Sequence, residues 1–373
     1  MTLRILLLGP VHDGGSLPPY LDVLTDALTA HGAAVTRHGS TEIPYDPGTG
    51  RFWPAERIRA RAAELAADID PSAHDVIALH AGNLEYDQLI PALLPTGSDV
   101  PVVHHVHTLA PTLLREHTPA PELQQLVDSA YAAAAGHVWF GAYARDRHPL
   151  PATNHGASVV AWLPTTIPAA TRPAAGIALG KALATDLPIV SLYGYAAPWK
   201  DAQLLVDALA HVRTPVRAVL VGDFWDDPDQ AGVDLRKYVN TPRPVGRAGE
   251  LVVVPGYVDA PARLALVQAS TAAVFPYRPH PSFQGSGAIA DYLAHATPIV
   301  ATDTANMAEL VGPAGVTVRT SQPAAFALGI DDVVGGGAHH RWAAHRAHHF
   351  TPDAHAARCL RAYSAAAATR APR

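Results

Sequence analysis

Residues 272–302 read AAVFPYRPHPSFQGSGAIADYLAHATPIVAT, and this stretch is the most informative part of the sequence. It begins with a short apolar run, Ala272–Phe275, of the kind found in buried parallel strands, which helices cover on both faces. A Gly/Ser-rich loop and a helix candidate, Gly287–His295, follow, and then a second apolar run, Pro298–Ala301. A strand, a loop, a helix and a strand in this order predict one βαβ unit of a parallel sheet.

The same alternation extends along the rest of the chain. Three apolar runs precede this stretch, at Ile189–Leu192, Arg217–Val221 and Leu251–Val254, with helix candidates at Ala202–Val212 and Ala260–Ala269. The first part of the chain repeats the pattern with runs at Ile5–Leu8, Val76–His80, Val102–Val106 and Val138–Phe140, and with helix candidates at Leu17–His31, Pro54–Asp68 and Leu123–Ala135. The sequence therefore predicts an α/β protein with two Rossmann-like, doubly wound domains.

A proline-rich segment separates the two sets of runs. We expect residues 1–165 to form the first domain, residues 166–188 to form a linker, and residues 189–345 to form the second domain. Residues 346–373 are expected to form a helical tail, interrupted near Pro352.

The composition excludes several classes of protein. The 373 residues carry a net charge of −6 without a basic run, which argues against binding to nucleic acid or to an anionic membrane. The single cysteine, Cys359, excludes an internal disulfide and favours a reducing cytoplasm. The first apolar run is too short for a signal peptide, and no 18-residue apolar stretch predicts a membrane span.

Candidate ligand-binding residues of the second domain follow its strands. The backbone N–H groups of Gly285, Ser286, Gly287 and Ala288 would face a diphosphate at the start of a helix, although this segment could also be an N-cap and a turn. Asp291 could accept hydrogen bonds from ribose hydroxyls, and Arg278 could add positive charge.

A second loop of this domain, which begins at Gly194, carries Lys200. This lysine could reach a phosphate, or it could be an ordinary solvated lysine.

The first domain offers candidates for acceptor binding. His12, Asp13, Gly14 and Gly15 follow its first strand, and Asn83 follows a later one. They would lie where open α/β sheets bind ligands, although the glycines could simply form a tight turn.

Two histidines of the first domain, His105 and His107, share one strand face because side chains alternate along a strand. No neighbouring Cys, Asp or Glu in the sequence completes a metal-ligand set, so no metal is expected there.

The segment from Gly285 to Asp303 resembles the donor-site signature of family-4 retaining glycosyltransferases, which have the GT-B fold. That family usually places two glutamates eight positions apart before a proline. Aligned on Pro298, the second falls on Asp291 and the first on Phe283, so one acid is kept and the other is lost. The resemblance implies two domains facing a central cleft, with the C-terminal helix crossing back onto the first domain.

The resemblance extends to other residues. Gly194 and Lys200 resemble the family's Gly-Arg…Lys diphosphate clamp, in which the arginine is missing here, so Arg278 is expected to compensate. Val106-His107-Thr108-Leu109 resembles the family's Val-His-Asp-Leu strand end, which implies that His107 contacts the donor sugar.

The resemblance implies a retaining glycosyltransferase in which His107, Lys200 and Arg278 are catalytic. It would move a sugar from a UDP- or GDP-sugar to a small-molecule or glycan acceptor in the cytoplasm, without a metal or another cofactor, in the biosynthesis of a specialised metabolite such as an antibiotic. A homodimer is possible. The alternatives are a nucleotide-sugar epimerase and a non-catalytic nucleotide-sugar-binding protein.

Overall fold

The computed structural model describes residues 2–46, 48–49, 51–82, 85–95, 97–109, 121–148, 157–280 and 285–369. The chain divides into two compact units. The first comprises Met1–Trp162, Pro281–Gln284 and Pro352–Arg373, and the second comprises Leu163–His280 and Gly285–Thr351. The segment expected to be a linker, residues 166–188, therefore falls inside the second unit.

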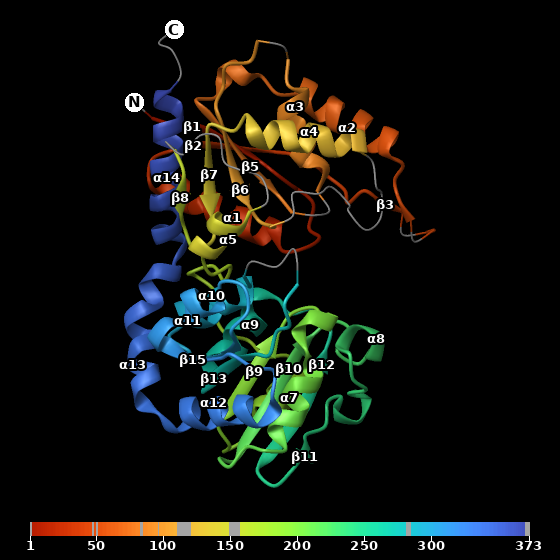
Figure 1. The fold of residues 1–373 in the computed structure, drawn as a ribbon, viewed down its shortest axis with the longest axis vertical. Coiled ribbons are helices and arrows are strands. Elements are labelled where there is room, and N and C mark those ends of the chain that lie inside the picture. The colour runs from red at the N-terminus through yellow and green to blue at the C-terminus, as the bar shows by residue number, and fades with distance from the viewer. Residues whose placement is uncertain are drawn as a thin grey trace. The chain divides into compact units, whose positions relative to one another are not determined.

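The first unit is built on a six-stranded parallel sheet (Figure 1). Its strand order is β2 (Ala34–His38), β1 (Arg4–Leu8), β5 (Val76–Ala81), β6 (Val102–Val106), β7 (Gly136–Trp139) and β8 (Val159–Val160). A separate antiparallel pair joins β3 (Tyr45–Asp46) and β4 (Arg51–Phe52). The core strands are apolar runs because helices cover both of their faces.

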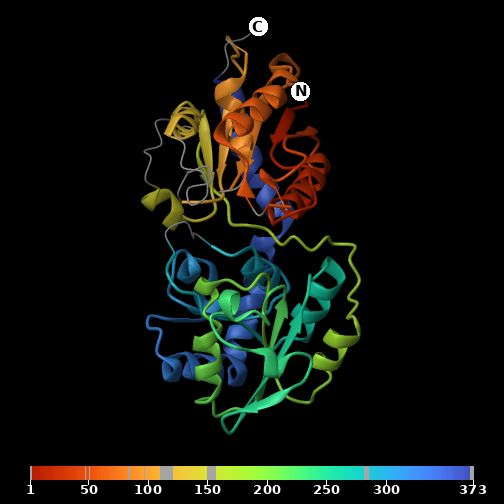
Figure 2. The same cartoon turned by 90° about the vertical axis from the view of Figure 1, so that its right-hand side faces the viewer.

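The helices of the first unit form two layers. One layer contains α1 (Leu17–Ala30) and α14 (Pro352–Ala368), which pack on each other and, in the case of α14, on β5 to β8. Figures 1 and 2 show α14, in dark blue, alongside these strands. The other helices of the unit are α2 (Ala55–Ala67), α3 (Ile90–Leu93), α4 (Pro121–Ala132) and α5 (Ala142–Arg147). The C-terminal helix thus belongs to the first unit, as expected.

The second unit contains a seven-stranded sheet. Its strand order is β11 (Arg243–Val245), β12 (Gly249–Pro255), β10 (Val216–Gly222), β9 (Ile189–Tyr193), β13 (Ala272–Phe275), β14 (Ile299–Thr302) and β15 (Gly315–Val318). Only the edge strand β11 is antiparallel to its neighbour. The helices are α6 (Ile177–Leu183), α7 (Ala202–Leu209), α8 (Pro228–Ala231), α9 (Ala260–Ala269), α10 (Gly287–Ala294), α11 (Met307–Val311), α12 (Pro323–Gly335) and α13 (Gly337–Arg346).

The two sheets, which are parallel except for the edge strand β11, confirm the predicted α/β fold with two Rossmann-like halves. The order of strands in the second unit reverses at β9, because the chain continues to β10 on one side and later returns to β13 on the other. Ligands of such sheets bind outside the carboxyl ends of the strands at this reversal. The residues that follow β9 and β13 therefore lie where sheets of this kind bind their ligands.

Candidate functional site

Gly194 and Lys200 meet at the carboxyl end of β9. Gly194 has a φ of +117°, and a β-carbon built on it would lie 2.7 Å from the Lys200 Nζ atom. The absence of a side chain at Gly194 therefore gives the ammonium its space. The structure brings these two predicted residues together.

Lys200 is a half-buried cation. Burial lowers the pKa of Lys200 to about 8. Within the part of the chain that the structure describes, no hydrogen bond or ion pair joins its side chain to another group. A desolvated ammonium without a carboxylate gains more from an anionic ligand than a solvated lysine does.

Arg278, after β13, is bound to Asp201. Its Nε and Nη2 atoms donate to the two carboxylate oxygens of Asp201 at 2.6 and 2.8 Å, and this hydrogen bonding raises the pKa of Arg278. Asp201 also caps α7 by accepting a hydrogen bond from the Leu204 N–H group at 3.1 Å. The guanidinium remains 57% exposed, but a buried carboxylate balances its charge. Arg278 therefore adds less net positive charge than the sequence suggested.

The loop and helix that follow β13 place backbone donors at the same sheet edge. Ser286 is the N-cap of α10, and its side chain makes no cap hydrogen bond. Gly287, the first residue of the helix, is exposed. At Gly285 a β-carbon would lie 2.7 Å from the Asn306 Oδ1 atom, so only glycine fits there without displacement. The first N–H groups of α10, including that of Ala288, have no partner within the helix and suit an anion.

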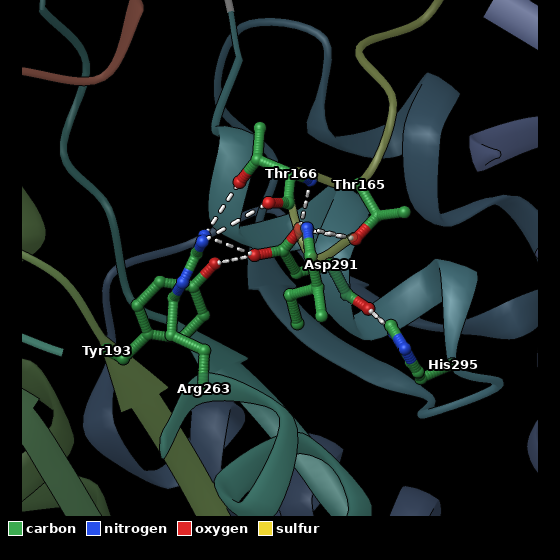
Figure 3. A network of polar contacts seen from close by, with 7 residues as sticks. Thr165, Thr166, Tyr193, Arg263, Asp291 and His295 are labelled. Atoms are coloured by element: carbon green, nitrogen blue, oxygen red, sulfur yellow. Dashed lines mark hydrogen bonds and ion pairs between the residues drawn. The ribbon is translucent and has the colours of Figure 1, made fainter. Parts of the chain in front are cut away.

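Asp291, on α10, is the centre of a buried network (Figure 3). One carboxylate oxygen accepts hydrogen bonds from the Thr165 hydroxyl at 2.7 Å and from the Thr166 N–H group at 2.8 Å. The other accepts from the Tyr193 hydroxyl and pairs with the Arg263 guanidinium at 2.9 Å. Burial, and then the charge of Asp291, raise the pKa of Tyr193.

This network changes the interpretation of Asp291. The side chain is fully buried and both oxygens are occupied, so the predicted hydrogen bond to a ribose would require the loss of an internal partner. The sequence does carry a signal for burial, because Asp291 lies within the apolar run Ile289–Leu293. Sequence reasoning missed its four partners, which come from segments up to 126 residues away.

In the first unit, the loop after β1 carries the predicted residues His12, Asp13, Gly14 and Gly15. The Gly14 N–H group donates to the His12 Nδ1 atom at 3.1 Å. Asp13 and Gly15 are exposed, and Gly15 has a φ of +89° with no atom near its missing β-carbon. Asp13 and Gly15 are therefore accessible from solvent. Asn83 lies outside the described residues.

His107 lies at the edge of a group of rings. Its Nε2 atom is 3.3 Å from the His80 Nδ1 atom, and its ring contacts Tyr20 and Phe140 at centroid distances of 5.2 and 4.6 Å. Burial, and then the nearby His355, lower the pKa of His107 to about 3. The imidazole is therefore neutral near pH 7 and can donate or accept one hydrogen bond.

The structure adds groups to this region that the sequence did not place there. His105 lies on β6, whereas His107 lies one residue beyond the end of this strand, and their rings are 6.5 Å apart. However, α14 brings His355 and Cys359 to His105, so a thiol and a further imidazole do lie next to it. The sequence analysis found no cysteine near His105 because Cys359 and His355 lie about 250 positions away along the chain.

Most of the second unit matches a known protein family. Residues 187–335 match the family described as glycosyl transferases group 1. No curated protein matches the chain. Among the described helices, none has the length and apolar character needed to cross a bilayer.

Several solved structures share the fold over nearly the whole chain. Sucrose-phosphate synthase from Thermosynechococcus elongatus is similar with a TM-score of 0.63 and 16% identity, covering 99% of this chain and 97% of that one. AviGT4, a glycosyltransferase of avilamycin A biosynthesis, gives 0.58 and 18%, covering 98% of both. HepE from Anabaena, in complex with UDP and glucose, gives 0.55 and 15%, covering 97% of both. The solved structures confirm the GT-B fold, and the similarity to glycosyl transferases group 1 covers residues 187–335.

Proposed function

We propose that this protein is a retaining glycosyltransferase that moves a sugar from a nucleotide-diphosphate sugar to a small-molecule or glycan acceptor. One observation carries the proposal: the Lys200 ammonium is desolvated, has no partner among the described residues, and occupies the space left by Gly194 at the strand reversal. Such a cation is suited to a leaving diphosphate, which gains negative charge as the glycosidic bond breaks.

The surrounding groups suit the same ligand. Tyr193, which ends β9 and precedes Gly194, bonds to Asp291 on α10, so α10 packs beside the end of β9. The first N–H groups of α10, at Gly287 and Ala288, would also neutralise negative charge on the diphosphate. We infer that the N–H groups of Gly287 and Ala288 and the Lys200 ammonium together neutralise the diphosphate in place of a metal ion. Arg278 contributes less, because Asp201 balances its charge.

The remaining roles extend the proposal. A neutral His107 is suited to a hydrogen bond with a sugar hydroxyl, and the His12–Gly15 loop is suited to the acceptor. HepE has been solved with UDP and with UDP-glucose, which favours a UDP-sugar as the first donor to test. The similarity to AviGT4 favours an acceptor from antibiotic biosynthesis. We place the reaction in the cytoplasm.

A thermal-shift panel of UDP- and GDP-sugars, with and without magnesium, tests the proposal. A ligand that binds the folded state raises Tm by mass action. We expect one nucleotide sugar to raise Tm equally with magnesium and with EDTA, and the shift to be lost in Lys200→Ala. The matched control is Lys181→Ala, which removes an exposed lysine of the same unit. The absence of a shift with every nucleotide sugar would overturn the proposal.

A further inference from the structure

A cluster of polar side chains lies in the core of the first unit, between β6 and α14. It comprises His105, His355 and Cys359, which have no exposed surface, and the hydroxyls of Tyr20 and Tyr363. We call these five residues the thiol cluster. The role proposed above for the second unit does not use them.

His355 is oriented so that one nitrogen points into the cluster. Its Nδ1 atom donates to the Trp162 carbonyl at 2.9 Å, which leaves Nε2 without a proton. The Nε2 atom lies 2.8 Å from the Tyr20 hydroxyl and 3.4 Å from the Cys359 sulfur. A nitrogen with one lone pair accepts one proton, so these two groups cannot both be its hydrogen-bond donors. Histidines that bind metals are commonly held in this way by a carbonyl on the other nitrogen.

His105 completes a set of three ligand atoms. One nitrogen of His105, one of His355 and the Cys359 sulfur lie within 4.8 Å of one another. The Tyr20 oxygen lies 3.4 Å from the His105 Nδ1 atom as well as near His355, so it faces the same centre. Two imidazoles and a thiolate are a donor set that zinc accepts, usually with a fourth ligand in tetrahedral geometry.

We propose that His105, His355 and Cys359 bind one zinc ion, with the Tyr20 oxygen as the fourth ligand. The Cys359 thiol releases its proton to solvent when zinc binds, so the bound group is a thiolate and the two imidazoles stay neutral. The ion would tie α14 to β6 and so stabilise the folded first unit.

The single cysteine makes a spectroscopic test specific. In the full-length, untagged chain loaded with cobalt(II), a thiolate-to-cobalt charge-transfer band can arise only from Cys359. We expect this band in the near ultraviolet, together with the strong visible bands of tetrahedral cobalt. The absence of the charge-transfer band in the cobalt-loaded wild-type chain overturns the proposal, and this readout needs no variant.

Elemental analysis gives a second, independent readout. We expect about one zinc per chain in the purified protein, and its loss in Cys359→Ser with the circular dichroism of a folded chain retained. The control is the double variant His345→Ala with His348→Ala, which removes two exposed histidines that could bind zinc loosely and should leave the content unchanged. Zinc that persists in Cys359→Ser, or that disappears in the control, would contradict the assignment.

Discussion

The Lys200 Nζ atom lies 2.7 Å from the point where Gly194 would carry a β-carbon. The two residues are six positions apart, and the lysine fills the space that the glycine leaves empty. A positive φ of +117° at Gly194 keeps the chain in a conformation that other residues rarely adopt. The position of the Lys200 ammonium therefore depends on a glycine at position 194.

Substitution of Gly194 should disturb the ammonium directly. In Gly194→Ala the new methyl group displaces Nζ and strains the backbone, at a cost to stability of about 1–3 kcal/mol. We expect the nucleotide-sugar thermal shift to be lost, as in Lys200→Ala. The control is Gly176→Ala, because Gly176 has a φ of −61° and open space around its missing β-carbon. An unchanged shift in Gly194→Ala would show that the lysine does not act from this position.

Donor binding should depend on pH through Lys200. The protonated amine binds the diphosphate, and with a pKa of about 8 it is fully charged below pH 7. We therefore expect the Kd, measured by calorimetry, to be constant up to about pH 7 and to rise up to tenfold per pH unit well above pH 8. Lys200→Arg, which stays charged, should bind with little pH dependence up to pH 9.5. A flat profile in the wild-type chain would contradict a role for this amine.

The unliganded protein should become more stable when this charge is removed. The pKa of Lys200 is lower in the folded chain than its ordinary value of 10.5, so the unfolded chain binds the proton more tightly. The resulting destabilisation is complete below about pH 8 and disappears above 10.5. Lys200→Met should therefore raise Tm at pH 7 while it abolishes the ligand shift, whereas Lys181→Met should change neither. A lower Tm in Lys200→Met would show that the lysine serves the fold.

The Asp291 network makes the opposite prediction about stability. Asp291→Asn leaves the Arg263 guanidinium without its buried carboxylate, and breaking such a pair costs about 3–5 kcal/mol. We expect a matching fall in the free energy of unfolding by denaturant titration, with little change for the exposed control Asp186→Asn. If the Asp291→Asn variant instead keeps the stability of the wild-type chain and loses donor affinity, Asp291 contacts the ribose, as the sequence predicted, and is not needed for the internal network.

The sequence predicted the fold well where the strands are buried. Runs such as Val102–Val106 and Ile299–Thr302 are apolar throughout because both faces of the sheet are covered. It missed edge strands such as β2 and β11, whose residues are partly exposed and polar and so lack this signal.

For the candidate site, the sequence indicated residues but not their partners. A loop after a strand pointed to Gly194 and Lys200, which the structure does bring together. The bond from Arg278 to Asp201 and the burial of Asp291 depend on tertiary contacts across 77 and 126 residues, which no local pattern encodes. The same reason explains why Cys359 was not associated with His105.

Turnover of the donor is the most direct measure of the proposed sugar transfer. The nucleotide sugar that gives the largest thermal shift should be incubated with the protein in EDTA, with an acceptor panel and with water alone, and followed by proton NMR. We expect the nucleoside diphosphate to be released. We also expect the product or the free sugar to appear first with the anomeric configuration of the donor. A donor that stays bound and intact with every acceptor and with water, or a sugar that first appears with inverted configuration, would contradict it.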